Sequence, residues 1–122
     1  RHDVESRGLG DVYKRQHYAP KAQVTIVQGS FAQYRAYVAA HAGPGVYALC
    51  FDGEGAQLPV PAIEYGGAGD DAAQAHHLFA ALRALDRAGA RVAYARAPER
   101  DGVAMAVYNR LLRAAAFRVV EV

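Results

Sequence analysis

The sequence from Asp70 to Arg113 is DDAAQAHHLFAALRALDRAGARVAYARAPERDGVAMAVYNRLLR, and it predicts a helix, a strand and a second helix with short connections. Apolar residues in its first part recur at the spacing of one helix face, at Leu78, Phe79, Leu82 and Leu85. Asp70 or Asp71 can cap the first turn. Gly89 can end this helix, because glycine adopts left-handed backbone angles without steric cost.

The strand predicted at residues 91–96 is apolar on both of its faces, which is typical of a strand covered by two layers. The second helix has its own apolar stripe, formed by Ala104, Val107, Tyr108, Leu111 and Ala115. A central strand between two helices indicates a layered α/β domain.

Shorter patterns on either side of this stretch extend the alternation. Apolar runs predict strands at residues 23–28, 46–51, 61–65 and 118–122. A helix is predicted from Phe31 to about His41, because Ser30 and Gln33 match the capping box S-x-x-Q. The order and the short connections favour a three-layer α/β/α, Rossmann-like domain with a mostly parallel sheet.

Charge and composition exclude several classes of protein. Of the 122 residues only Cys50 is a cysteine, which excludes a disulfide framework. Residues 22–122 hold nine basic and nine acidic side chains, so we expect no direct tRNA binding by the exposed arginines Arg83, Arg110 and Arg113. The sequence shows neither a membrane-spanning apolar run nor a recognisable signal peptide, so a cytoplasmic protein is expected.

The loop GAGDDA at residues 67–72 formally matches the dinucleotide-binding pattern G-x-G-x-x-A. Asp70 and Asp71 would repel a pyrophosphate at the start of the helix, even though the helix dipole favours an anion there. We therefore expect a tight turn followed by a helix cap at this loop.

Two other candidate groups are expected to be structural. His76 and His77 are adjacent, so on a helix they point roughly 100° apart and cannot bind one metal ion together. Cys50 lies in a predicted buried strand and is expected to pack as a small apolar residue. The sequence predicts no metal site and no catalytic residue.

The N-terminal residues 1–16, RHDVESRGLGDVYKRQ, have no helical or strand periodicity. We interpret them as a disordered or non-native leader, because DVYKRQ resembles the translated remnant of a sequencing adapter. Residues 23–122 are expected to form the α/β domain, and the resemblance given next implies that residues 17–22 are the remnant of an interdomain linker.

Two segments resemble one enzyme family. HYAPKAQVTIVQG at residues 17–29 resembles the junction where a linker enters the C-terminal accessory domain of long-form threonylcarbamoyl-AMP synthases. LFAALRALDRAGARVAYARAPERDGVAMAVYNRLLRAA at residues 78–115 looks like the second half of that domain, including an LRxLD pattern at residues 82–86 and NRL at residues 109–111.

The resemblance implies a role in a nucleotidyltransferase that converts ATP, L-threonine and bicarbonate to threonylcarbamoyl-AMP, which is used to make threonylcarbamoyl-adenosine in tRNA. In this family a YrdC-type catalytic domain carries the chemistry, and ATP and Mg would bind there. We expect the present chain to be a fragment without that domain. It would be inactive alone and would cover or regulate the active site of its partner domain.

The resemblance also singles out His17 and Tyr18 as candidate nucleotide-contacting residues, since both present donors on an extended segment. The alternative is that Tyr18 packs the linker onto the domain. A second hypothesis for the whole chain is a freestanding Rossmann-like ligand-binding module without catalysis. That module would use the mouth at the carboxyl ends of the strands, near residues 52–55 and 96–101.

Overall fold

A computed structural model describes residues 19–122 of the chain, so the predicted leader and the candidates His17 and Tyr18 lie outside the described residues. The predicted order of strands and helices is confirmed, with one short 3-10 helix in addition. The elements are β1 (Gln23–Gln28), α2 (Phe31–Ala40), β2 (Val46–Cys50), η1 (Gly55–Gln57), β3 (Ala62–Glu64), α3 (Asp71–Ala88), β4 (Val92–Arg96), α4 (Gly102–Ala114) and β5 (Val119–Glu121).

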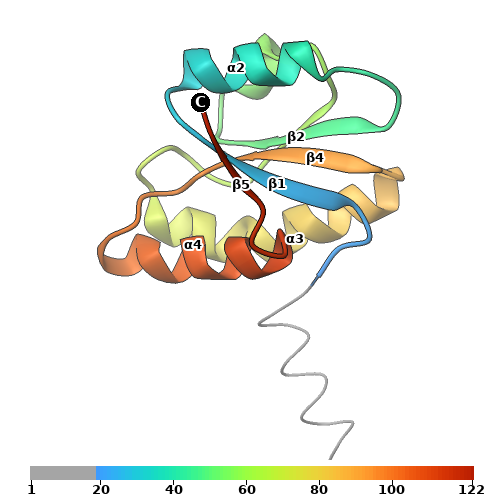
Figure 1. The fold of residues 1–122 in the computed structure, drawn as a ribbon. Coiled ribbons are helices and arrows are strands. Elements are labelled where there is room, and N and C mark those ends of the chain that lie inside the picture. Colours follow the sequence, from blue (N-terminus) through green and yellow to red (C-terminus); the bar gives the residue numbers. More distant parts are fainter. Residues whose placement is uncertain (1–18) are drawn as a thin grey trace, which may run out of the picture.

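The five strands form one sheet in the order β3-β2-β4-β1-β5 (Figure 1). Every pair of neighbouring strands is parallel. The strand predicted to be buried, β4, is the central one, and its Ala93 pairs with Val24 of β1 and with Tyr47 of β2. The sheet is therefore fully parallel, where the sequence predicted a mostly parallel one.

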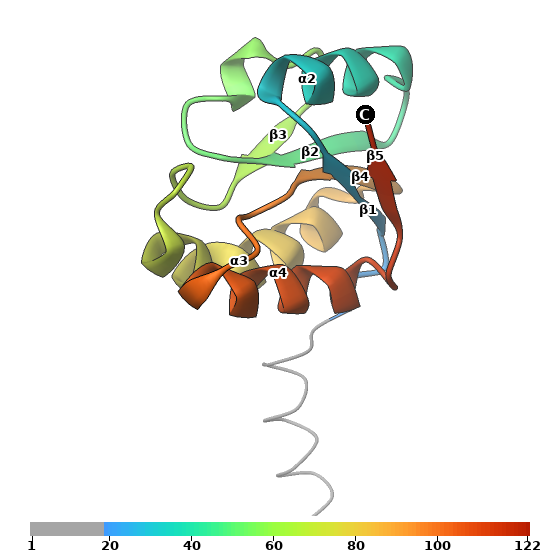
Figure 2. The ribbon, with the colours of Figure 1, turned by 60° about the vertical axis from the view of Figure 1, so that its left-hand side comes forward.

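Helices cover both faces of the sheet, so the three-layer α/β/α architecture is confirmed. Figures 1 and 2 show α2 on one face and α3 and α4 together on the other. The larger apolar core lies beneath α3 and α4 and includes Leu82, Leu85 and Leu111. A smaller core beneath α2 contains Tyr34 and Val38.

The local signals in the sequence act as predicted. Ser30 and Gln33 form the capping box of α2, with Gln33 N–H donating to Ser30 Oγ at 3.1 Å and Ser30 N–H donating to Gln33 Oε1 at 2.9 Å. Gly89 ends α3 in the left-handed region, at φ 78°. None of the helices within residues 19–122 combines the length and apolar character that a membrane span requires.

The topology creates a crevice at one edge of the sheet. Adjacent strands β1 and β4 send the chain to opposite faces, because α2 follows β1 on one face and α4 follows β4 on the other (Figure 1). In open α/β sheets, ligands bind outside the carboxyl ends of the strands at such a switch point. The fold therefore directs attention to the residues that follow β1 and β4.

Gly66, between β3 and α3, is held where no other residue fits well. Its φ is +120°, and a Cβ atom at this position would lie 2.8 Å from Gln74 N and 3.0 Å from the carbonyl carbon of Ala73. Its carbonyl accepts Asp52 N–H at 2.9 Å, which ties the loop after β2 to this point.

We predict that Gly66→Ala lowers the free energy of unfolding by roughly 1–3 kcal/mol, since it adds backbone strain and a clash with the first turn of α3. Urea denaturation measures the change. Gly43→Ala is the matched control, because a Cβ there meets no atom within 4 Å, and it should leave the stability nearly unchanged. Equal effects of the two substitutions would contradict the argument.

Candidate functional site

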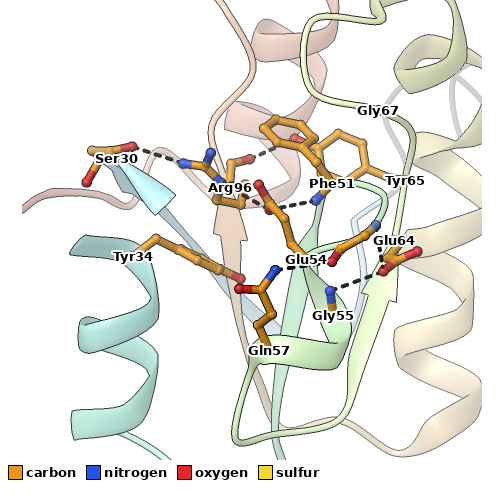
Figure 3. A network of polar contacts seen from close by, with 12 residues as sticks. Ser30, Tyr34, Phe51, Glu54, Gly55, Gln57, Glu64, Tyr65, Gly67 and Arg96 are labelled. Atoms are coloured by element: carbon orange, nitrogen blue, oxygen red, sulfur yellow. Dashed lines mark hydrogen bonds and ion pairs between the residues drawn. The ribbon is translucent and has the colours of Figure 1, made fainter. Parts of the chain in front are cut away.

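Arg96, the last residue of β4, links three loops at the carboxyl edge of the sheet (Figure 3). Its Nε–H donates to Glu54 Oε1 at 3.2 Å and to Oε2 at 3.3 Å. Its Nη1 donates to the carbonyl of Gly29 at 3.0 Å. The residues that follow β1, β2 and β4 are thereby joined through one guanidinium group.

Aromatic rings enclose the same guanidinium group. Its central carbon lies 5.7 Å from the ring centroids of Phe31 and Tyr34 and 5.2 Å from that of Phe51. The side chains of Arg96 and Glu54 are only 13% and 14% exposed. At this burial the opposite charge of Glu54 and the ring faces both stabilise the cation, so Arg96 is fixed in position.

Two carboxylates hold the loop between β2 and β3. Glu54 Oε1 accepts the backbone N–H of Phe51 at 3.1 Å, in addition to its ion pair with Arg96. Glu64 Oε2 accepts the N–H groups of Gly53 and Gly55, both at 3.1 Å (Figure 3). These acidic side chains are therefore engaged in the structure of the edge and are poorly placed to act as general bases.

Buried hydroxyl and thiol groups beneath this edge remain protonated. Tyr34 Oη donates to the carbonyl of Tyr94, and Tyr65 Oη donates to the carbonyl of Arg96, both at 2.7 Å. Burial raises the pKa of Tyr34 and of Tyr65 well above the ordinary value. Cys50 is fully buried, which confirms that it packs in the core. Its burial, followed by the charge of Glu54, raises the pKa of the thiol to about 12, which opposes a nucleophilic role.

A cavity of about 360 Å³ opens beside Arg96, within the size range of small-molecule sites. It lies at the switch point, because β1 contributes Gln28 and Gly29 and the loop after β4 contributes residues 97–100. The remaining lining comes from Phe51 after β2 and from the entry to α3, namely Ala68, Gly69 and Gln74. Among the residues that the structure describes, the lining offers amide, guanidinium and carboxylate side chains that can bind a ligand, and no serine, cysteine or histidine.

The binding mouth predicted from the sequence, near residues 52–55 and 96–101, agrees with the observed cavity on one of its two sides. Residues 96–100 line the cavity, whereas residues 52–55 form the neighbouring loop, and Phe51 is the lining residue on that side. Sequence reasoning missed Gln28 and Gln74. The sequence did contain a signal for Gln74 that the prediction did not use: this glutamine lies four residues before Leu78, in line with the buried stripe of α3.

The other candidate groups have structural positions. The predicted turn and cap at residues 67–72 are confirmed, since Gly69 has φ +80° and Asp70 Oδ1 accepts Ala73 N–H at 3.1 Å. His76 and His77 are exposed on α3, with ring centroids 4.7 Å apart. Within residues 19–122, no three histidine, cysteine, aspartate or glutamate side chains are grouped to hold a metal ion.

The raised pKa of Cys50 predicts that stability falls in alkaline solution. From pH 9, the ordinary pKa of this thiol, up to about 12, the unfolded chain releases the proton while the folded chain keeps it. The unfolded state then binds fewer protons, so the folding equilibrium constant falls by up to about tenfold per pH unit for this group. Tyr34 and Tyr65 act in the same direction from pH 10.

Urea denaturation between pH 8 and pH 10 measures this loss for the unsubstituted chain and for Cys50→Ala. The variant should lose less stability over the interval from pH 9 to pH 10, because its unfolded state has no thiol to ionise. Parallel pH profiles for the two proteins would show that the thiol is not protected in the folded state.

Comparison with known proteins gives the family context of this fold and cavity. The family model for the C-terminal domain of threonylcarbamoyl-AMP synthase matches residues 10–116. The threonylcarbamoyl-AMP synthase of Pyrococcus abyssi is 34% identical over 116 residues, an alignment that covers 89% of this chain and 32% of the relative. The chain thus spans about a third of the length of that relative.

Solved structures agree with this match. The crystal structure of Pyrococcus abyssi Sua5 complexed with L-threonine superposes with a TM-score of 0.67 at 29% identity, covering 87% of this chain and 32% of that one. A variant of the same protein, with an adjacent histidine and tyrosine replaced by alanine, gives a TM-score of 0.69 at 28% identity, with coverages of 84% and 30%.

A further crystal structure contains a C-terminal Sua5 domain alone, from Pyrococcus horikoshii. It gives a TM-score of 0.63 at 26% identity and covers 85% of this chain and all of that one. The family model and the isolated Pyrococcus horikoshii domain both correspond to the C-terminal domain of such proteins. The chain therefore belongs to the family of threonylcarbamoyl-AMP synthase C-terminal domains.

Proposed function

We propose that this chain is the accessory part of a threonylcarbamoyl-AMP synthase and acts on a YrdC-type catalytic domain. ATP, L-threonine and bicarbonate would react on that domain, where ATP and Mg bind, and the product would serve tRNA modification. The observation that carries this proposal is the match of residues 10–116 to the C-terminal domain of such enzymes.

The proposed action is to position the segment that precedes β1 over the catalytic cleft. The first described residues of that segment are tied to the domain, because Lys21 N–H donates to Asp86 Oδ1 on α3 at 2.9 Å. Ala22 is buried in the core beneath α3 and α4. A segment that is anchored to a folded domain at one end can close over a reactive site and exclude water from it.

His17 and Tyr18 are the residues proposed to contact the nucleotide. They form the single His-Tyr dipeptide of this sequence and precede the anchored residues by a few positions. A solved variant of the Pyrococcus abyssi relative has an adjacent histidine and tyrosine replaced by alanine, which supports a comparison at this dipeptide. Closure matters in this chemistry because a carbamoyl-adenylate is a mixed anhydride that water hydrolyses.

A chimaera tests the proposal. Residues 17–122 would replace the C-terminal third of the Pyrococcus abyssi enzyme, and threonine-dependent release of pyrophosphate would be measured. We predict an active chimaera, in which the double substitution His17→Ala and Tyr18→Ala lowers the rate by up to about 100-fold through lost positioning. The double substitution His76→Ala and His77→Ala, an exposed adjacent pair on α3, is the matched control and should retain the rate.

Two results would contradict the proposal. A catalytic domain that works equally well without residues 17–122 would show that the accessory domain is dispensable. A full rate in the variant of His17 and Tyr18 would show that the domain acts without this dipeptide.

A further inference from the structure

We infer that the cavity at the switch point is a ligand site of the accessory domain itself, for a small organic anion that also carries hydroxyl or amino donors. The cavity lies at the carboxyl ends of β1 and β4, whereas the chain enters the sheet at the opposite edge, at the start of β1. The inference therefore does not rest on the proposed action of His17 and Tyr18.

The strongest observation is the side chain of Gln74, which lines the cavity and is 1% exposed. Its Nε2 donates to the carbonyl of Gly67 at 2.8 Å, which fixes the orientation of the carboxamide group. Its Oε1 is buried and has no donor among the described residues. A buried acceptor without a donor destabilises the folded state, and a donor on a ligand would offset that loss.

A second acceptor without a donor belongs to another residue of the lining. Gln28, at the end of β1, lines the cavity, and its Oε1 is also buried without a donor among the described residues. Two unsatisfied carboxamide oxygens in one lining set the chemistry of the occupant. It must present N–H or O–H groups, as an amino acid, a sugar or a nucleoside does.

The cationic side chains of the lining add the preference for an anion. Nε and Nη1 of Arg96 are engaged by Glu54 and Gly29, while Nη2 has no partner within residues 19–122. Arg100 stands at the rim, with its guanidinium carbon 5.5 Å from the ring centroid of Tyr108. Glu99 is the one carboxylate among the described lining residues. Because Glu54 neutralises Arg96 from outside the lining, these charges sum to zero, and the preference for an anion rests on the guanidinium group of Arg100.

The N-termini of the two nearby helices, α3 and α4, differ in how their acidic side chains are used. Asp70 caps α3 and Asp71 lies in its first turn, so negative charge already occupies that helix start. At α4 the N-cap Asp101 makes no side-chain cap bond, and Arg100 precedes it. Both helix starts thus carry a carboxylate, and Arg100 is the cation on the side of the cavity formed by the loop between β4 and α4.

Calorimetric titration of the 122-residue chain with four probes tests this inference. AMP, ribose 5-phosphate and L-threonine carry both an anionic group and donors, and they distinguish a nucleotide, a sugar phosphate and an amino acid as the source. Inorganic phosphate is the anion without the organic donors. We predict binding of at least one of the first three probes, tighter than that of phosphate.

Variants identify the site. Arg100→Ala should weaken the binding of that probe by about tenfold, as loss of a charged hydrogen bond does, and Gln74→Met should weaken it by at least as much. Gln28→Met probes the second acceptor if Gln74→Met fails to fold. Arg83→Ala, an exposed arginine on α3 outside the cavity, is the matched control and should bind like the unsubstituted chain.

The inference is overturned if none of the organic probes binds, if phosphate binds as tightly as they do, or if the cavity variants bind normally. These results are independent of the chimaera. If the chain binds AMP but the chimaera is inactive, the accessory function alone is refuted. If the chimaera is active but the accessory domain binds none of the probes, the cavity site alone is refuted.

Discussion

The ion pair between Arg96 and Glu54 is the interaction on which the carboxyl edge of this domain depends. A buried charge pair repays its loss of hydration only when its geometry is good and its remaining donors are satisfied. Here the carboxylate receives Nε–H at both oxygens, Nη1 reaches Gly29, and three rings surround the cation. Three loops far apart in sequence thus share one polar centre, and the wall of the cavity is part of it.

The amino and carboxyl edges of the sheet have separate proposed functions. At the amino edge, the bond from Lys21 to Asp86 roots the segment that leads toward the proposed catalytic partner. At the carboxyl edge, the lining of the cavity includes two arginines together with Gln28 and Gln74, whose Oε1 atoms have no donor among the described residues. A rigid parallel sheet lies between them, so binding at one edge and closure at the other are physically separable functions of one domain.

Sequence patterns predicted the structural features that depend on neighbouring residues, such as helix caps, and missed the contacts between residues far apart in the chain. The capping box at Ser30 and the glycine end of α3 are local signals, and the structure confirms them. The pairing of Arg96 with Glu54 joins residues 42 positions apart, and only the strand order brings them together. Gln74 is an intermediate case, because its place on the buried stripe of α3 is a local signal, whereas its bond to the carbonyl of Gly67 depends on how the preceding loop folds. The family resemblance supplied the context that spacing alone did not.

The most direct test of the central claim is a double-mutant cycle in urea denaturation on Glu54→Gln and Arg96→Met. Each single substitution leaves one charge or one polar group buried without its partner and should cost roughly 3–5 kcal/mol. The double variant should cost clearly less than the sum, because it buries neither charge. Strictly additive losses, or single variants as stable as the unsubstituted chain, would show that this ion pair does not organise the edge.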